Sequence, residues 1–241
     1  MDLLTVLTSP RANKSYLADT LASLERAGAN DVDRRVVVCD GPVPRGVSTS
    51  WEAYSLGSEP GGNMRAFFEV MRFAVNHGAQ RLLYFEDDVV AAPNAIHHML
   101  SVGVPDHLAF VTFFDMKEMF AGAAPGLYSV STMGKEGWGF WGMQAVLYPN
   151  ATMHYALANQ TRIMNRFPGI KHSSDVALGY DLLYSSRSSY GVHVPGLFEH
   201  IGEASSIWTN RGGWDDYEIN RRATSFIGEA ADANGCECRC R

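Results

Sequence analysis

Three adjacent carboxylates, Glu86, Asp87 and Asp88, follow the apolar run Arg81–Phe85 and are the strongest chemical signal in the sequence. Like charges this close repel one another unless a cation or solvent offsets the repulsion. Carboxylate oxygens are ligands for hard divalent ions such as Mg²⁺ and Mn²⁺, and these ions also bind diphosphates. The run therefore indicates a candidate metal site, although acidic loops after strands also occur without one.

Four other features could take part in chemistry. Asp175 could act as a base, or it could simply favour the N-terminus of a helix through the helix dipole. His200 could bind a metal, or it could be a hydrogen-bonded structural residue. Asp40 could accept a hydrogen bond from a nucleoside, or it could cap a turn. The aromatic loop Gly137–Gly142, which includes Trp141, could stack on a sugar ring or belong to the core.

The elements that must position these residues alternate in the first half of the chain. Predicted strands cover Leu3–Thr8, Arg35–Cys39 and Arg81–Phe85, and predicted helices cover Tyr16–Arg26 and Met64–Asn76. Continuous apolar strands are typical of parallel sheets with helices on both faces. Ligands bind such folds at the carboxyl ends of the strands, which is where Asp40 and the three acids fall.

The second half has a weaker pattern. It predicts strands at Leu108–Phe114, Gly142–Tyr148 and Gly191–Pro195, a helix at Asp175–Tyr184 and a polar break at Glu199–Gly202. No internal repeat and no interdomain linker is evident. We therefore expect one α/β domain over 1–221, with a nucleotide-binding half at about 1–115 and an acceptor-binding, catalytic half at about 116–221. A cysteine-containing tail follows at 222–241.

The composition excludes several classes of protein. Of the 241 residues, 46% are hydrophobic and 19% are charged, which is typical of globular proteins. No apolar run approaches the ~18 residues of a membrane helix, and the N-terminus lacks a signal-peptide pattern, so we expect a cytosolic protein without a membrane span. The net charge of -6 argues against a broad nucleic-acid-binding surface.

Four cysteines give little support for a disulfide framework. Cys39 lies in an apolar run, and Cys236, Cys238 and Cys240 crowd the tail. Their spacing is closer than that of usual metal sites, so a reactive tail is the favoured interpretation and a thiol cluster is the alternative.

Absent motifs narrow the class further. No dinucleotide-binding, P-loop or nucleophile-elbow signature occurs, which disfavours a dehydrogenase, a P-loop ATPase and an α/β-hydrolase. A sugar-nucleotide pyrophosphorylase should carry a glycine-rich N-terminal signature with a lysine, and residues 9–15 contain no glycine.

Five segments occur in an order and with residue types that match one known family. They are Pro10–Arg11 with Ser15–Leu24, Leu83–Val90 with Pro93–Asn94, Gly139–Gly142, Asp175 with Leu178 and Leu182–Tyr184, and Pro195–Gly202 with Ser205–Ser206. Together they resemble the catalytic domain of the N-acetylglucosaminyltransferase IV family, whose members branch N-glycans.

The resemblance implies a GT-A fold with a Rossmann-like nucleotide-binding half and an acceptor half around a central mixed sheet. It also implies a UDP-sugar donor, Mn²⁺ or Mg²⁺, and inversion at the anomeric carbon. By position, Asp88 matches the metal ligand, Glu86 and Asp87 match donor-contacting acids, and Asp175 matches the proposed base. We expect His200 as a weaker second metal ligand or a diphosphate contact. Further donor contacts are expected at Thr8, Pro10, Arg11, Asp40, Asn63 and Trp141.

The sequence also departs from that family. We expect no membrane anchor, stem or C-terminal carbohydrate-binding module, and Ser173–Ser174 stands where the family has Pro-Ile, so a glycoprotein acceptor is not implied. We expect transfer of N-acetylglucosamine or another hexose to a carbohydrate or other hydroxyl acceptor. Two alternatives stay open. One is a DNA-modifying glycosyltransferase acting on hydroxylated nucleobases, which the acidic charge disfavours, and the other is a non-catalytic nucleotide-sugar-binding protein.

Overall fold

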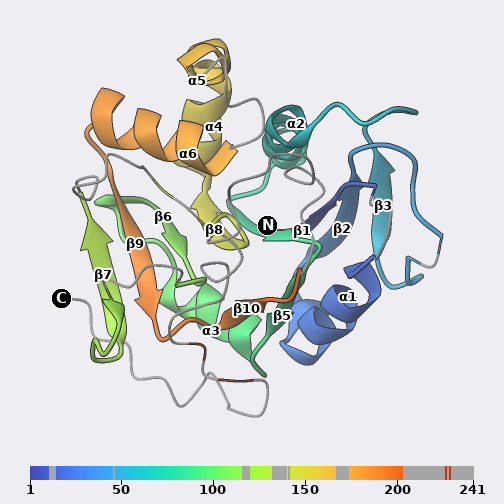
Figure 1. The fold of residues 1–241 in the computed structure, drawn as a ribbon, viewed down its shortest axis with the longest axis horizontal. Helices are drawn as coiled ribbons and strands as arrows, with labels where there is room; N and C mark the ends of the chain where they lie inside the picture. Colours follow the sequence, from blue (N-terminus) through green and yellow to red (C-terminus); the bar gives the residue numbers. More distant parts are fainter. Residues whose placement is uncertain are drawn as a thin grey trace, which may run out of the picture.

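The computed structural model describes residues 1–10, 15–45, 47–115, 120–131, 140, 142–166, 174–202, 226 and 228. These residues form an α/β protein in which eight strands make one large mixed sheet and two more make a small ribbon (Figure 1). The predicted α/β class and central mixed sheet are therefore confirmed.

The strands alternate with helices along the chain. The strands are β1 (Asp2–Thr8), β2 (Arg34–Cys39), β3 (Glu52–Ser55), β4 (Arg81–Glu86), β5 (Val89–Ala91), β6 (Leu108–Thr112), β7 (Gly126–Val130), β8 (Ala145–Pro149), β9 (Ser189–Val194) and β10 (Phe198–His200). The helices are α1 (Leu17–Arg26), α2 (Asn63–Asn76), α3 (Ala95–Val102), α4 (Asn150–Ala158), α5 (Gln160–Arg166) and α6 (Ser174–Tyr180), with a 3-10 turn at Ala29–Asp31. A π-helical turn, Asp181–Ser185, continues α6.

The large sheet joins both halves of the chain. Its strand order is β3-β2-β1-β4-β8-β6-β9-β7. The strands β3, β2, β1 and β4 run parallel to one another, and β8 pairs antiparallel with both β4 and β6. Strand β8 thus lies between the parallel first half and the remaining strands, and β6 lies beyond it among the strands of the second half.

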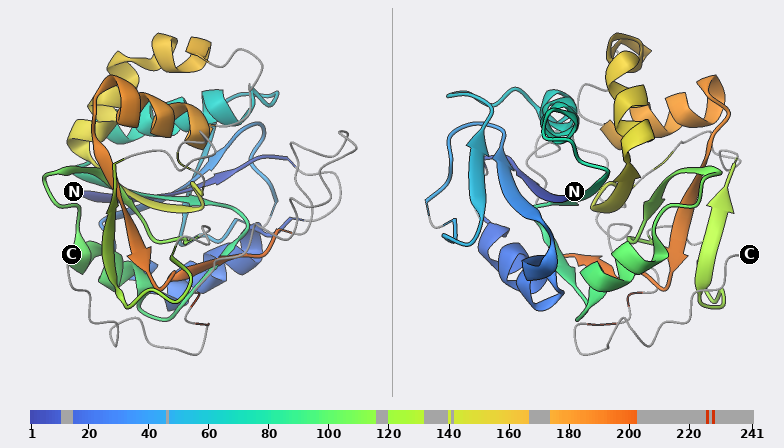
Figure 2. Two further views of the ribbon diagram at one scale, coloured as in Figure 1. Left: turned by 60° about the vertical axis from the view of Figure 1, so that its left-hand side comes forward. Right: turned by 180° about the vertical axis from the view of Figure 1, so that it is seen from behind.

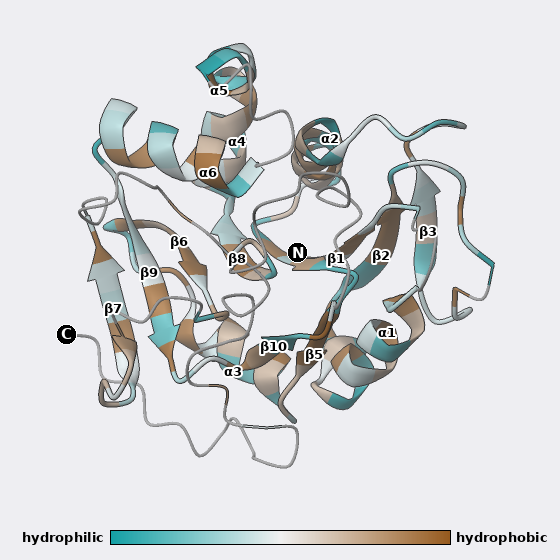
Figure 3. Cartoon of the chain, in the orientation of Figure 1, coloured by the Kyte–Doolittle hydropathy of each residue, from teal (hydrophilic) through white to brown (hydrophobic). Residues whose placement is uncertain are grey.

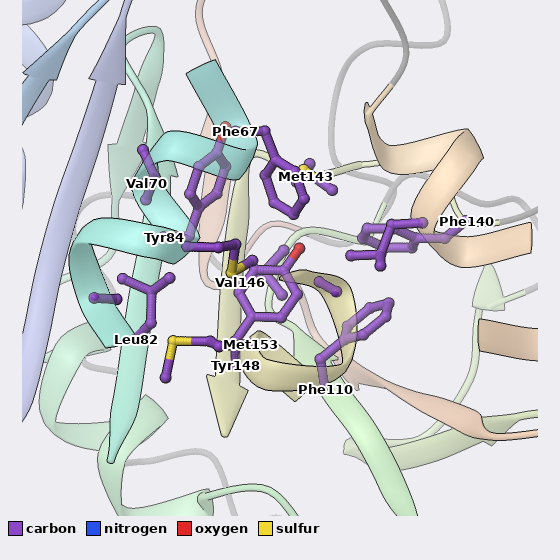
Figure 4. Packing of buried hydrophobic residues seen from close by; sticks show 14 of the residues in the cluster. Phe67, Val70, Leu82, Tyr84, Phe110, Phe140, Met143, Val146, Tyr148 and Met153 are labelled. Atoms are coloured by element: carbon purple, nitrogen blue, oxygen red, sulfur yellow. The ribbon is translucent and has the colours of Figure 1, made fainter. Parts of the chain in front are cut away.

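Helices cover both faces of this sheet. One core cluster packs β1, β4 and β8 against α2, α4 and α6, and the other packs the opposite face against α1 and α3. The views in Figures 1 and 2 show α2, α4, α5 and α6 on one side and α1 and α3 on the other. Figure 4 shows the first cluster, where Phe67 of α2 packs over Tyr84 and Tyr148 of the sheet.

Amphipathic patterning explains the long helices. In α1, Leu17, Leu21 and Leu24 are buried at helical spacing, and hydrophilic and hydrophobic residues alternate around the helix in Figure 3. Helix α2 buries Phe67, Phe68 and Met71 in the same way. No helix among the described residues has the length and apolarity that a membrane crossing requires.

Several predicted boundaries were wrong. The polar break predicted at 199–202 begins inside β10, where His200 pairs with Val89 of β5. The strand predicted at Leu108–Phe114 ends at Thr112, and the helix predicted at Asp175–Tyr184 changes to π-helical geometry at Asp181. For β10, backbone pairing with the distant strand β5, rather than the local hydrophobic pattern, sets the element.

Candidate active site

A tight turn carries the acidic run. Strand β4 ends at Glu86, and Asp87 and Asp88 form the turn into β5. The short antiparallel ribbon of β5 and β10 then brings His200 back to Asp88, so that His200 Nε2 lies 3.1 Å from Asp88 Oδ2. The Ile201 N–H donates to the Asp88 carbonyl over 2.8 Å. Both side chains are buried, so the structure brings the two predicted metal ligands together.

A glycine keeps space beside this pair. A Cβ on Gly202 would lie 2.5 Å from Asp88 Oδ2 and 2.9 Å from His200 Nε2. Carboxylate oxygen and imidazole nitrogen are both suitable ligands for Mn²⁺, so the donor set fits a divalent ion. No group of three or more His, Cys, Asp or Glu side chains surrounds such a position among the described residues. Water and diphosphate oxygens complete the coordination of such ions in many sites.

Asp87 ties the acidic turn to the first strand and helix. Its Oδ2 accepts a short hydrogen bond from the Thr8 hydroxyl, and its carbonyl accepts one from Thr20 Oγ1 over 2.9 Å. The same Thr20 oxygen accepts the Val89 N–H over 3.2 Å. Two predicted donor contacts, Thr8 and Asp87, therefore contact each other, and their role toward a donor stays a prediction.

Asp40 organises the loop that leads into α2. Its Oδ1 and Oδ2 accept the N–H groups of Gly61 and Gly62 over 2.7 and 3.0 Å. Gly62 has a φ of 89°, a left-handed value that favours glycine immediately before the helix. The Asp40 N–H donates to the Thr8 carbonyl over 2.8 Å. The Asp40 carboxylate therefore fixes the loop before α2 rather than the turn at Gly41, and its role toward a nucleoside stays a prediction.

Asp175 lies in the first turn of α6, beside the start of α2. The preceding Ser174 hydroxyl donates to Asn63 Oδ1 over 3.3 Å. The Asp175 carboxylate accepts the N–H groups of Val176 over 2.8 Å and Gly142 over 3.4 Å. Burial raises the pKa of Asp175 above its usual value, and the two N–H groups offset part of that rise. A carboxylate with a raised pKa is a better proton acceptor near neutral pH.

Residues 142–144 connect Asp175 to the acidic turn. The Gly142 N–H reaches Asp175, and two residues later the Gln144 carbonyl accepts the Glu86 N–H over 3.2 Å. The contacts described above therefore form a closed circuit. It runs from Asp40 through Gly61, Gly62, Asn63, Ser174, Asp175, Gly142, Gln144, Glu86, Asp87 and Thr8 back to Asp40.

The circuit brings together predicted residues from both halves of the chain. Pro10 lies beside it, because a Cβ on Gly41 would be 3.1 Å from the Pro10 ring. In α6, Gly179 packs closely against Phe140. A Cβ on Gly179 would lie 2.3 Å from the Phe140 Cβ, so there is no room for a side chain at this position. Arg11 and Trp141, two further predicted donor contacts, lie outside the described residues, as do Cys236, Cys238 and Cys240 of the tail.

Two carboxylates change our interpretation of the neighbourhood. Asp115 is fully buried and follows β6, and the sequence analysis missed it although an acid after an apolar strand is the signal that identified Asp40 and the acidic run. Asp181, the other acid of the helix predicted around Asp175, is also fully buried. Its carboxylate is paired with Arg162 over 2.8 and 3.0 Å and with the Tyr155 hydroxyl over 2.8 Å, which is a structural arrangement.

No protein-family model matches the chain, and no curated protein is significantly similar to it.

Proposed function

We propose that this chain is an inverting, metal-dependent glycosyltransferase of the GT-A type, which transfers a hexose such as N-acetylglucosamine from a UDP-sugar to a hydroxyl acceptor. The observation that carries this proposal is the contact circuit, which holds Asp175 and the acidic turn at one edge of the sheet. An inverting transfer needs a base and a diphosphate-binding group on opposite sides of the reacting carbon.

The chemistry assigns a separate role to each carboxylate. The acceptor oxygen forms a bond to the anomeric carbon while the bond from that carbon to the UDP oxygen breaks. Asp175 takes the acceptor proton as the new bond forms. Asp88 and His200 would hold the divalent ion, which offsets the negative charge that develops on the departing diphosphate. Glu86 and Asp87 are the proposed donor contacts nearest to that ion.

Binding and turnover are tested separately with the full chain. Thermal shift with a panel of nucleotide-sugars is measured with and without Mn²⁺, because a ligand that binds only the native state raises Tm. UDP release is then measured with sugar acceptors, with oligonucleotides that contain hydroxymethylated bases, and with no acceptor. We expect a Mn²⁺-dependent Tm rise with a UDP-sugar and UDP release that increases with an acceptor. Binding without any acceptor-dependent release would instead indicate a nucleotide-sugar-binding protein.

A further inference from the structure

Four buried side-chain atoms on the central strands β1, β4 and β8, or directly before β8, have no hydrogen-bond partner among the described residues. They are Thr5 Oγ1, Tyr84 Oη, Gln144 Oε1 and Tyr148 Oη. A buried polar group without a partner costs roughly 1–3 kcal/mol, so such groups are uncommon in native structures and call for an explanation. All four come from β1, β4 or β8 or the residue directly before β8.

The sheet register explains how these atoms come together. Thr5 is opposite Tyr84 in the parallel pair of β1 and β4, and Tyr148 is opposite Leu82 in the antiparallel pair of β4 and β8. Tyr84 and Tyr148 pack edge to face with ring centroids 6.3 Å apart, and Figure 4 shows their hydroxyl groups extending in the same direction. Glu86 is two residues after Tyr84 on β4, so its side chain leaves the same face of the sheet.

The carboxylates of the candidate site act on both phenols. Burial raises the pKa of Tyr148 well above its usual value, and the charges of Asp175 and then Glu86 raise it further. Burial likewise raises the pKa of Tyr84, with Glu86 the largest charge contribution and Tyr148, Asp175 and Asp87 after it. Each phenol therefore lies within electrostatic reach of the proposed base and of the acidic turn.

The described cations on the neighbouring helices are placed elsewhere. On α2, the Arg65 side chain lies against Gly61, and Arg72 pairs with Glu69 over 2.5 Å. On α5, Arg162 and Arg166 lie 2.8 and 3.8 Å from the Asp181 carboxylate. His154 on α4 is exposed. Among the described residues, the charges that act on the two phenols are therefore those of the carboxylates.

The electrostatic field of the carboxylates determines the orientation of the two hydroxyl groups. The hydrogen of a phenol rotates to suit its surroundings, and side-chain dipoles orient in the local field of the protein. Where no acceptor among the described residues fixes it, each O–H is expected to align its positive end with the negative carboxylates. A dipole in that orientation favours the ionised form of a carboxylate.

We propose that Tyr84 and Tyr148 are positioning residues of the candidate active site, whose buried O–H groups are oriented toward the carboxylates there, and that Tyr148 stabilises the ionised form of Asp175. The catalytic consequence rests on the proposed function: Tyr148 keeps Asp175 able to accept a proton at neutral pH. Stabilising the ionised form lowers the pKa of Asp175, whereas burial raises it.

The test is a direct titration of the carboxyl groups in the full chain by ¹³C NMR. The Asp175 resonance is assigned by its loss in Asp175→Asn. In Tyr148→Phe, the Asp175 pKa should rise by roughly half a unit or more. Because the same assigned carboxyl group is titrated in both proteins, this change can be resolved even though carboxyl pKa values differ by ~1 unit from site to site. Tyr190→Phe is the matched control, because Tyr190 is also buried and burial alone raises its pKa. An unchanged Asp175 pKa in folded Tyr148→Phe overturns the proposal.

A second measurement keeps the hydroxyl groups of both tyrosines in place. In protein labelled with 3-fluorotyrosine, the ¹⁹F resonance of Tyr148 should shift with the midpoint of the Asp175 titration, and that shift should disappear in Asp175→Asn. A Tyr148 resonance that ignores this titration also overturns the proposal. Neither readout needs a donor or an acceptor. A positive titration result without sugar transfer would therefore overturn the proposed function and its catalytic consequence while leaving the electrostatic coupling established.

Discussion

The imidazole Nε2 of His200 lies 3.1 Å from Oδ2 of Asp88, although the two residues are far apart in the sequence. Asp88→Asn should abolish the Mn²⁺-dependent rise in Tm, because a neutral amide is a poor ligand for a hard cation. Isothermal titration with Mn²⁺ and UDP checks this directly.

The surface pair Asp31–His97 provides a control of the same chemistry, with a separation of 2.8 Å and both side chains exposed. Asp31→Asn should leave Mn²⁺ binding unchanged. Unaltered Mn²⁺ affinity in Asp88→Asn would remove the carboxylate from the proposed metal site.

Gly202 should be required for ion binding because a side chain at this position would collide with Asp88 and His200, and not because the backbone needs a glycine conformation. In Gly202→Ala, the new methyl group would lie 2.5 Å from Asp88 Oδ2, so the two ligands must separate. We expect Mn²⁺ affinity to fall about tenfold or more, which is typical when the groups that orient metal ligands are altered.

Gly61→Ala is the matched control for this change. A Cβ there would also meet a side chain at 2.6 Å, but the atom belongs to the flexible Arg65. Equal loss of Mn²⁺ affinity in both variants, measured by titration calorimetry, would indicate general destabilisation and contradict the local explanation.

Asp175→Asn should separate turnover from donor binding. Loss of a positioned base lowers kcat by about 10²–10⁴-fold, and the dissociation constant of the donor should stay nearly constant. Because burial raises the pKa of Asp175 in the folded state, its ionised form opposes folding at neutral pH. The variant should therefore show a higher Tm than the natural chain at pH 7, and this gain should disappear at acidic pH where both carry no charge.

Asp181→Asn should show the opposite behaviour. Although burial alone would raise the pKa of Asp181, hydrogen bonds from Arg162 and Tyr155 hold it below its usual value. Its ionised form therefore stabilises the fold above about pH 4, and the stabilisation is lost as the pH falls. This variant should lower Tm at pH 7 and retain kcat. Loss of kcat without loss of stability in Asp181→Asn would reverse the assignment of the base.

The buried pair His98 and His193 should make stability sensitive to acid. Their Nε2 atoms are 2.9 Å apart, and His193 Nδ1 donates to the Pro195 carbonyl over 2.7 Å, so His193 Nε2 accepts a hydrogen bond from His98 Nε2. Burial lowers the pKa of His193 to about 4 and also lowers that of His98. The unfolded chain therefore binds more protons than the folded chain between about pH 4 and 6.5.

The free energy of unfolding should consequently rise with pH across that window, by on the order of 3 kcal/mol from His193 alone. Urea unfolding at several pH values measures this slope. It should flatten in His193→Asn and persist in His154→Asn, which changes an exposed histidine. An identical slope in the natural chain and His193→Asn would show that other groups control the acid response.

Local sequence patterns were sufficient for the buried parallel strands. β1, β2 and β4 are continuous apolar runs because both of their faces are covered by helices. β3 was missed because all of its residues are exposed and its strand geometry comes from pairing with β2. β10 was missed for a related reason, since its strand consists of only three residues paired with β5.

The same distinction applies to the candidate site. Asp40 and Glu86 could be placed at the ends of strands because that position depends only on the local chain. The link between Asp175 and Glu86 was beyond prediction, because it depends on β8 inserting between β4 and β6, and no local pattern specifies strand order. The unpartnered hydroxyl groups of Tyr84 and Tyr148 were also invisible, since a tyrosine in an apolar strand has the same pattern whether or not its hydroxyl is satisfied.

The backbone span 142–144 has a mechanical consequence. The Gly142 N–H donates to the Asp175 carboxylate at one end of this span, and the Gln144 carbonyl accepts the Glu86 N–H at the other. A short stretch of covalent chain therefore lies between Glu86 and Asp175. Peptide geometry is nearly fixed, and Asp175 belongs to α6, so sliding of α6 away from Glu86 would have to break the hydrogen bond between the Gly142 N–H and Asp175. Adjustment to acceptors of different size must then come from other parts of the site.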